Sequence, residues 1–385
     1  MKLYALFLLL LLTACSDISS PDAIKLGMLA PITGPVPTCG EDMLIGLDLV
    51  LIRLNQTNGP LLNVILEDSQ FSPKVAVSAA TKLYDSDGVN FIVGDCGSSS
   101  TLAVAPLAEQ RKKILFSPMS FADQISEAGQ FIFRFASTPS EEVPLLIPFV
   151  LDHDVRRVGI IYLNNDYGKS YSQRFTSGFL AEGGEIVFSE SAEPPETDFR
   201  TVLLKAQELD AQALLIATSL PQTLALLRQA ESFGMDIPLF STQTAEHETI
   251  LDEVGDYAED RLYFTSLVDV SSSWIQTNSQ TERFYDLFAR HYPSKVPNTE
   301  ILETYDTILL LAQSISSCGD DPVCVQEHFA TLSSFQSATG NNSMDSHGDV
   351  KHGHIVFKTV RDGVFVTVEG ASSRPLGRKS SGFSP

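Results

Sequence analysis

The sequence predicts an α/β protein made of two doubly wound parallel-sheet lobes. Short runs rich in β-branched and aromatic residues alternate with longer helical patterns, which is typical of βαβ units. The alternation occurs in two successive sets, so we expect two lobes. The chain has 385 residues, of which 43% are apolar, and this is enough for two or three domains with real cores.

The first set supplies the predicted first lobe. Helices between its strands imply that the strands run parallel. The expected strands are residues 24–29, 64–67, 91–94, 114–117 and 131–135, and the expected helices are residues 41–54, 73–84 and 101–110.

The second set repeats this pattern after a connection near residues 137–142. We expect it to form a second parallel sheet with its own covering helices. Its expected strands are residues 158–163, 185–189, 213–217, 239–241 and 262–264, and its expected helices are residues 170–182, 199–209 and 222–232.

After about residue 266 the alternation stops. Three helical patterns follow at residues 281–291, 301–316 and 325–332, and then two strands at 355–360 and 364–368. The turn Arg361-Asp362-Gly363 between these strands is a hairpin signal. The late helices can join the first lobe, and the hairpin can join the second lobe. The chain must then cross between the lobes more than once, which gives a multi-strand hinge. The predicted division is residues 24–139 with 267–348 for lobe 1, and 140–266 with 349–370 for lobe 2.

The N-terminus has the pattern of an export signal. Lys2 is followed by a nearly continuous apolar run, residues 3–12, which is too short to span a bilayer. The run ends in Leu12-Thr13-Ala14-Cys15, which resembles a bacterial lipobox, so we expect acylation of Cys15. This predicts a signal peptide over residues 1–14, a tether over 15–23, and an extracytoplasmic protein anchored by lipid alone. The alternative is an ordinary signal peptide cleaved after Ala14. The Ser/Gly/Pro-rich segment 371–385 is predicted to be disordered.

The net charge excludes two classes of partner. With 26 Lys and Arg against 48 Asp and Glu, the formal charge is −22. There is no basic surplus to replace the counterions of nucleic acid or to bind an anionic membrane surface. We therefore expect no nucleic-acid partner and no electrostatic attachment to a membrane.

Four cysteines remain once Cys15 is set aside, an even number in an oxidising compartment. Cys318 and Cys324 bracket a five-residue loop and are expected to form a local disulfide. Cys39 and Cys96 would then have to pair across the fold. A redox or metal role is the alternative, but the sequence has no C-x-x-C and no Cys/His cluster, so we expect no metal and no cofactor.

A serine-rich turn follows the predicted strand 91–94. Ser98, Ser99, Ser100 and Thr101 stand where a helix is expected to begin. Hydroxyls and free backbone N–H groups at a helix start can bind an anion or a carboxylate. The alternative is that one serine only caps the helix. The turn also resembles the nucleophile elbow of a hydrolase, but Ser98 stands where the second glycine of G-x-[SC]-x-G belongs. We therefore expect no enzyme and no catalytic residue.

From residue 24 to residue 368 the chain resembles the type I periplasmic binding proteins, in particular the branched-chain amino-acid (Leu/Ile/Val-binding) family. The order and spacing of several short motifs carry the resemblance. They are Ile24-Lys25-Leu26-Gly27, Ile32-Thr33-Gly34-Pro35, Glu67-Asp68 with Pro73, the serine turn, Pro118, Asp166-Tyr167-Gly168, Arg228-Gln229-Ala230 and Tyr305-Asp306.

The resemblance implies a site between the lobes. Ser98 matches the family serine that holds the ligand carboxylate, and Tyr167 matches an aromatic wall of the second lobe. Phe121 stands where a hydroxyl is usual, although Ser120 is adjacent. An aromatic residue of the first lobe is replaced by Cys39, which the resemblance places with Cys96 on adjacent loops at the cleft.

Three further positions belong to the implied site. Two of them depart from the family pattern, and the third lies near a position that is close to the ligand in the family. The family acid for the ligand ammonium falls on Gln243, which is neutral. A second aromatic falls on Ser219. Glu300 lies near a position close to the ligand side chain, and it either compensates for Gln243 or is a solvated helix residue. A buried ammonium needs a carboxylate or several good acceptors, and Gln243 offers one neutral carbonyl. A solute with a carboxylate and an uncharged, polar or aromatic remainder therefore fits at least as well.

The resemblance also implies a monomeric clamp that closes on a small solute and delivers it to a membrane permease with its ATPase. The alternative is a sensor or assembly module with the same clamp fold, in which a partner protein reads the closure.

Overall fold

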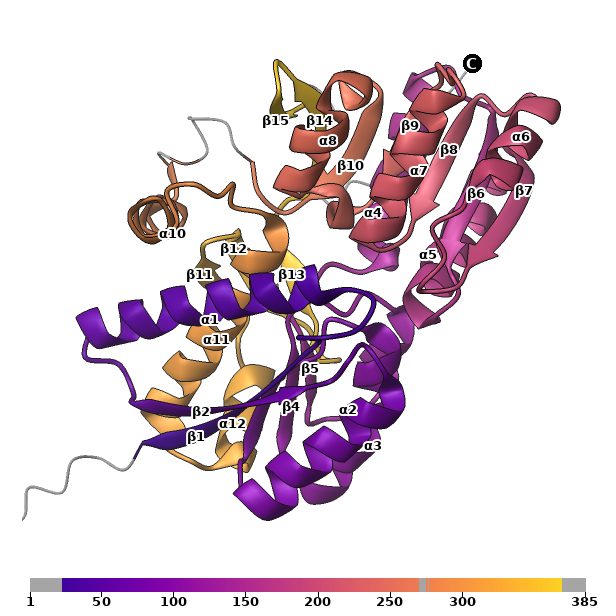
Figure 1. Ribbon diagram of the computed structural model, residues 1–385. Helices are drawn as coiled ribbons and strands as arrows, with labels where there is room; N and C mark the ends of the chain where they lie inside the picture. The colour runs from indigo at the N-terminus through magenta and orange to yellow at the C-terminus, as the bar shows by residue number, and fades with distance from the viewer. Residues whose placement is uncertain (1–22, 270–274, 276, 369–385) are drawn as a thin grey trace, which may run out of the picture.

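Two separate sheets form the framework of the chain in the computed structural model (Figure 1), which describes residues 23–269, 275 and 277–368. Each sheet carries its own helices, and the predicted α/β class with two lobes is confirmed. The predicted signal peptide, the tether up to residue 22, Cys15 and the tail from residue 371 all lie outside the described residues.

The first sheet has the order β2-β1-β3-β4-β5, and all its strands are parallel. Its strands are β1 (Ile24–Ala30), β2 (Leu62–Asp68), β3 (Phe91–Gly94), β4 (Ile114–Ser117) and β5 (Ile132–Arg134). Its helices are α1 (Pro37–Gln56), α2 (Pro73–Thr81) with a π-helical turn at Lys82–Asp87, α3 (Ser98–Arg111), α11 (Thr299–Cys318) and α12 (Pro322–Ala330).

Both faces of this sheet are buried, as in other parallel sheets. Side chains alternate between faces along a strand. In β1, Leu26 and Met28 join the core shared with α1 and α11, whereas Leu29 joins a second core with the alanines of α2 and α3. The apolar runs that form the central strands β3 and β4 are therefore buried on both sides.

The second sheet has the order β15-β14-β10-β9-β8-β6-β7. Its first five strands in sequence are parallel to one another. The C-terminal hairpin extends the sheet, with β14 antiparallel to β10 and β15 antiparallel to β14. The strands are β6 (Arg157–Leu163), β7 (Glu185–Ala192), β8 (Ala213–Ala217), β9 (Leu239–Ser241), β10 (Leu262–Ser266), β14 (Val356–Arg361) and β15 (Val364–Thr367).

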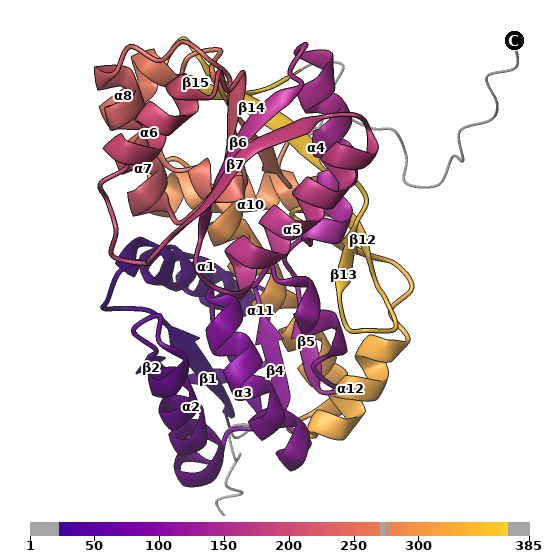
Figure 2. The same ribbon diagram turned by 90° about the vertical axis from the view of Figure 1, so that its right-hand side faces the viewer.

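Helices cover both faces of the second sheet as well (Figure 2). Two of them were not predicted from the sequence, α4 and α8. The helices are α4 (Pro139–Asp152) and α5 (Asp166–Ala181) on one face, and α6 (Arg200–Glu208), α7 (Leu220–Ser232) and α8 (Glu248–Ala258) on the other.

A small third sheet, also absent from the prediction, lies between the late helices and the hairpin. Its order is β11-β12-β13, with β11 (Phe335–Ser337), β12 (Gly340–Met344) and β13 (Val350–His352). Helix α10 (Ser279–His291) precedes α11. The chain was predicted to return to the second lobe at residue 349, just before β13. However, β13 belongs to the third sheet, and the next strand of the second sheet is β14. The division between lobes remains a prediction at the level of single residues.

Helices α1 and α11 pack together although they lie far apart in sequence (Figure 1). At Gly46 an added Cβ would lie 2.7 Å from the Ile301 carbonyl oxygen, so only glycine allows this approach. Arg53 Nη1 donates a 2.7 Å hydrogen bond to the hydroxyl of Tyr305, which lies 252 residues later. The N-terminal and C-terminal parts of the chain thus build one lobe together.

A buried ion pair fixes the chain where it leaves the first sheet. Arg134 at the end of β5 is fully buried and donates from Nε to Asp349 Oδ1 over 2.9 Å. Arg134 Nη1 also donates to the Ala122 carbonyl over 2.6 Å, and Ser126 Oγ donates to Asp349 Oδ2 over 2.6 Å. Because each charge has several partners, the pair holds two hinge segments in one arrangement.

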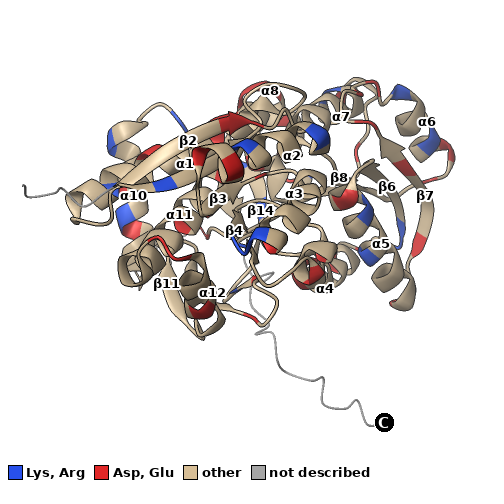
Figure 3. Cartoon of the chain, turned by 90° about the horizontal axis from the view of Figure 1, so that it is seen from below, with Lys and Arg blue, Asp and Glu red and all other residues tan. Residues whose placement is uncertain are grey.

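Acidic residues occur in elements of both lobes (Figure 3). Within the described part of the chain, none of the helices combines the length and apolar character needed to span a bilayer.

Candidate functional site

A cavity lies between the lobes, at the carboxyl ends of both parallel sheets. Segments that follow β1, β3 and β4 approach it from the first lobe, and those that follow β6, β8 and β9 from the second. Ligands of open parallel sheets bind at this end because the loops there differ freely without disturbing the sheet. The folding pattern alone therefore makes this cavity the candidate site.

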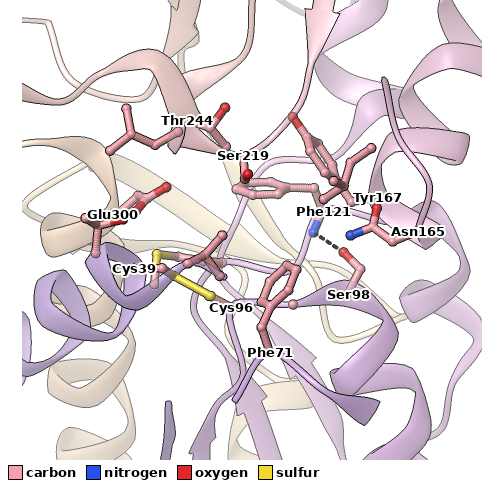
Figure 4. Close-up of a pocket in the computed structure, with 16 residues that line it drawn as sticks. Cys39, Phe71, Cys96, Ser98, Phe121, Asn165, Tyr167, Ser219, Thr244 and Glu300 are labelled. Atoms are coloured by element: carbon pink, nitrogen blue, oxygen red, sulfur yellow. Dashed lines mark hydrogen bonds between the residues drawn. A yellow bond between two sulfur atoms is a disulfide. The ribbon is translucent and has the colours of Figure 1, made fainter. Parts of the chain in front are cut away.

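The walls of the cavity are mainly apolar (Figure 4). Phe71, Phe121, Tyr167, Leu163 and Leu220 are among the side chains that form them. The cavity volume is about 50 Å³, which is room for a few water molecules. The two lobes thus lie close together around the cavity.

Five of the predicted site residues line this cavity: Ser98, Phe121, Tyr167, Ser219 and Glu300. They come from both lobes and from α11. Figure 4 shows Glu300 beside Cys39 at one end and Ser98 at the other, with the ring of Phe121 between them.

The other four predicted residues, Ser99, Ser100, Ser120 and Gln243, are not among those that line the cavity. Helix α3 begins at Ser98, and successive side chains of a helix point about 100° apart, so one serine faces the cavity and the next two do not. Ser99 instead contacts Asp166, and Ser120 Oγ lies 2.8 Å from Thr101 Oγ1. These residues support the site from behind.

Ser98 keeps a free proton for a ligand. Its Oγ accepts hydrogen bonds from the backbone N–H groups of Phe121 and Ala122, over 3.0 and 3.1 Å. The hydroxyl is buried, and both bonds use its lone pairs. Its O–H can therefore donate to an oxygen atom inside the cavity.

Asp95 lies beneath the serine turn and is fully buried. Its Oδ1 accepts from the N–H of Cys96 over 2.6 Å and from the N–H of Gly97 over 3.4 Å. Burial raises the pKa of Asp95 to about 6, against these hydrogen bonds and those from Ser69 and Ser100, which lower it. This side chain holds the turn in place, and part of the anion-binding capacity of the helix start is used internally.

Tyr167 is fixed within the second lobe and touches the first. Its hydroxyl lies 2.7 Å from Thr242 Oγ1, and its ring centroid lies 5.4 Å from that of Phe121. Burial raises the pKa of Tyr167, so the phenol stays neutral. The two rings form a tilted pair that closes the cavity between the lobes.

Ser219 begins α7, and its hydroxyl donates to Gln222 Oε1 over 2.9 Å. The resemblance placed an aromatic wall at this position, and the serine leaves space there instead. Its proton is already used by Gln222, so toward a solute Ser219 offers mainly an acceptor.

Glu300 is the acid of the cavity. Burial, together with the nearby carboxylates of Asp42 and Glu246, raises the pKa of Glu300 to about 8. Asp42 accepts a 2.7 Å hydrogen bond from Asn298 Nδ2, and burial raises the pKa of Asp42 to about 7. Glu246 is paired with Lys358 in a buried ion pair. Glu300 lines the cavity and is half-buried there.

Gln243 serves a different partner from the one expected. Its Nε2 donates to both carboxylate oxygens of Glu303, over 2.9 and 3.1 Å, and both side chains are buried. Burial raises the pKa of Glu303 well above its usual range, and the hydrogen bond from Gln243 acts against this. The neutral residue at the family's acidic position is thus matched by an acid on α11.

Both predicted cysteine pairs are disulfide-bonded in the structure. Cys39 and Cys96 have their Cα atoms 6.8 Å apart and line the cavity, and Cys318 and Cys324 close the short loop between α11 and α12. The first bond ties the start of α1 to the serine turn.

The cavity is also lined by Phe71, Asn165 and Thr244, which were not predicted from the sequence. Asn165 had a recognisable signal, because it directly precedes Asp166-Tyr167-Gly168 and caps α5 by accepting from the Gly168 N–H over 2.9 Å. Thr244 follows Gln243 directly, and its position in the cavity depends on the turn between β9 and α8.

No group of three or more His, Cys, Asp or Glu side chains in the described residues is arranged to hold a metal ion. The polar groups of the cavity suit hydrogen bonding and charge pairing with an organic solute.

Comparison with known proteins gives a consistent result. The family described as "Periplasmic binding protein" matches residues 23–365. The leucine-, isoleucine-, valine-, threonine- and alanine-binding protein of Pseudomonas aeruginosa is 24% identical over 342 residues, which are 86% of this chain and 88% of the relative. The Leu/Ile/Val-binding protein of Escherichia coli is 22% identical over 251 residues, 64% of this chain and 68% of the relative.

Solved structures show the same fold. A leucine binding protein from Thermotoga maritima superposes with a TM-score of 0.83 at 21% identity, covering 90% of this chain and 98% of the other. A solute binding protein of an ABC transporter from Rhodopseudomonas palustris, in complex with 3,4-dihydroxybenzoic acid, gives 0.81 at 21% identity, covering 91% of this chain and 97% of the other.

Proposed function

Because the chain belongs to the periplasmic binding protein family, we propose that it is an extracytoplasmic solute-binding protein of an ABC importer. It closes on a small polar solute and delivers it to the permease and its ATPase. The observation that carries the proposal is the cavity between the carboxyl ends of two parallel sheets, lined by side chains of both lobes. A solute bound there would stabilise the closed form of the clamp.

The relatives suggest which solutes to consider. The names of the bacterial relatives refer to leucine, isoleucine, valine, threonine and alanine, and one solved structure of this fold holds an aromatic acid. The apolar walls suit an aliphatic or aromatic body, and the Ser98 O–H suits an acceptor oxygen of the solute. We propose an amino acid, an amide or a carboxylate as the solute class.

We also propose attachment through an acylated Cys15, which would keep the monomeric clamp near its permease. A sensor or assembly lipoprotein with the same clamp is the second candidate. Uptake of the identified solute by cells lacking the gene discriminates the two: transport predicts a loss of uptake, and sensing predicts normal uptake with an altered response.

The binding function is tested by a thermal melt of the whole chain, purified in detergent, against amino acids, amides and small carboxylates. A solute that binds only the folded state raises the melting temperature by mass action. We expect at least one strong shift, which Ser98→Ala reduces and Ser177→Ala, at an exposed position of α5, leaves intact. A panel without any shift would contradict the proposal.

A further inference from the structure

We propose that the solute carries a cationic nitrogen, and that the Glu300 carboxylate binds it at the end of the cavity remote from Ser98. This inference rests on the proposed function and names the solute class for the same site. It predicts that an amine is required and that a simple carboxylate does not suffice.

Glu300 is the only Asp, Glu, Lys, Arg or His among the described residues that line the cavity. Its carboxylate forms no hydrogen bond and no ion pair with any described residue, and the residue is half-buried. A carboxylate that is half-buried without a partner loses part of its hydration, and a cation brought by the solute would offset that cost. Among the described residues that line the cavity, none supplies a positive charge to pair with the Glu300 carboxylate.

The neighbouring acids do not compete for this cation, because each already has a partner. Asp42 accepts from Asn298, Glu246 is paired with Lys358, and Glu303 accepts from Gln243. The charges of Asp42 and Glu246 already raise the pKa of Glu300, and the same negative potential favours a cation beside it and disfavours a solute whose only charge is negative. The raised pKa of Glu300 fits this arrangement, because a bound ammonium would restore the ionised form.

The remaining walls suit the rest of such a solute. Phe121 and Tyr167 provide aromatic surface for an apolar body, and Ser98 offers a hydroxyl proton to an acceptor oxygen at the other end. A solute with a nitrogen at one end and an oxygen at the other would contact Glu300 and Ser98 together.

The position of the acid distinguishes this site from the pattern implied by the family resemblance. That pattern places the acid for the ammonium at Gln243, whose Nε2 is occupied by Glu303. Here the acid that faces the cavity comes from the first turn of α11, in a different element. We therefore expect the nitrogen to lie nearer to α1 and the Cys39–Cys96 disulfide, as Figure 4 places Glu300.

The experiment is isothermal titration calorimetry on the whole chain in detergent with matched probes. L-Leucine carries both charged groups, 3-methylbutylamine lacks the carboxylate, and 4-methylpentanoate lacks the amine. Benzylamine and benzoate repeat the comparison with an aromatic body. Each probe is tested on the natural chain, on Glu300→Gln, and on Glu282→Gln as a control at an exposed position of α10.

We expect binding of at least one amine-bearing probe, and a weakening of roughly 10- to 100-fold in Glu300→Gln, the usual effect of losing a charge-assisted hydrogen bond. Glu282→Gln should bind as the natural chain does, and a cooperative melt of Glu300→Gln shows that it is folded. If 4-methylpentanoate or benzoate binds best and Glu300→Gln leaves its affinity unchanged, the inference is overturned and the proposed function stands. If none of the probes binds, the inference is overturned, and the wider thermal-melt panel decides whether the proposed function stands.

Discussion

Ser99 of the first lobe donates a 2.5 Å hydrogen bond to the carboxylate of Asp166 in the second lobe, and the Asp166 N–H donates back to Ser99 Oγ over 3.2 Å. This reciprocal pair joins the starts of α3 and α5 at the edge of the cavity. Because the pair joins the two lobes, separating the lobes at the cavity would break it. Ser99, which does not face the cavity, therefore stabilises the closed form relative to the open form.

Removing this contact should open the clamp. In Ser99→Ala we expect a larger radius of gyration of the unliganded protein by small-angle X-ray scattering. Solute affinity should fall about fivefold, since one hydrogen bond contributes about 1 kcal/mol to closure. Ser177→Ala is the matched control. An unchanged radius together with unchanged affinity would show that the pair does not influence closure.

Glu300 should make the stability of the unliganded protein depend on pH. The pKa of Glu300 is raised to about 8, so between its unfolded value near 4.5 and pH 8 the folded state binds more protons than the unfolded state. Stability should therefore fall as the pH rises through this window. Asp42, with a pKa raised to about 7, acts in the same direction.

The variant Glu300→Gln removes the contribution of Glu300 to the pH dependence of stability and leaves that of Asp42. We expect the variant to be more stable than the natural chain at pH 8.5, by roughly 2 kcal/mol after screening of the partly exposed side chain, and nearly equal at pH 5. Urea denaturation at both values measures the difference. The groups closest to Glu300 in this titration are Asp42, Glu246 and Glu303. A variant destabilised equally at both values would contradict the expectation.

Restoring an acid at position 243 should be harmful. In Gln243→Glu a second carboxyl group would face Glu303 at hydrogen-bond distance in a buried site, and two such groups cannot both ionise cheaply. We expect a loss of roughly 2–4 kcal/mol at pH 8 and a smaller loss at pH 5, where one proton is shared.

The exchange variant Gln243→Glu with Glu303→Gln provides the control for this prediction, because it retains one acid and one amide. It should recover most of the stability in a double-mutant cycle. Failure of the exchange to recover stability would mean that packing, and not charge, causes the loss.

The two disulfides should differ in their contribution to stability. Cys39 and Cys96 are 57 residues apart, and Cys318 and Cys324 are 6 apart. Loop-closure entropy predicts that removal of the first costs about 4 kcal/mol and of the second about 2 kcal/mol. Urea denaturation of the paired Cys→Ser variants tests this order, and a larger loss for the short loop would contradict it.

Much of the fold could be predicted from the sequence because the central strands are apolar runs buried on both faces. Residues 91–94 and 114–117 were expected as strands and are found with the same limits as β3 and β4. Helix α4 was missed because Pro144 and Pro148 lie within it, although Thr138 and Glu141 form a capping box at its start. Strand β12 is short and polar, and it gains its place only through pairing with its neighbours.

The site was less predictable because its key contacts connect distant parts of the chain. The serine turn was recognisable in the sequence as a binding element. Which of its hydroxyls faces the cavity, however, depends on where α3 begins. Gln243 and Glu303 are 60 residues apart, and Asp42 and Asn298 are 256 apart. Spacing and periodicity carry no information on such pairs, whereas packing of α11 against the rest of the cleft brings them together.

The packing of α1 against α11 has a consequence for biosynthesis. The partner of Arg53 is Tyr305, 252 residues later, so α1 leaves the ribosome long before the helix that covers it. At 5–20 residues per second the wait is on the order of tens of seconds. During that time the nascent N-terminal lobe exposes apolar surface, and we expect the growing chain to be a client of ribosome-associated chaperones until its last third has been translated.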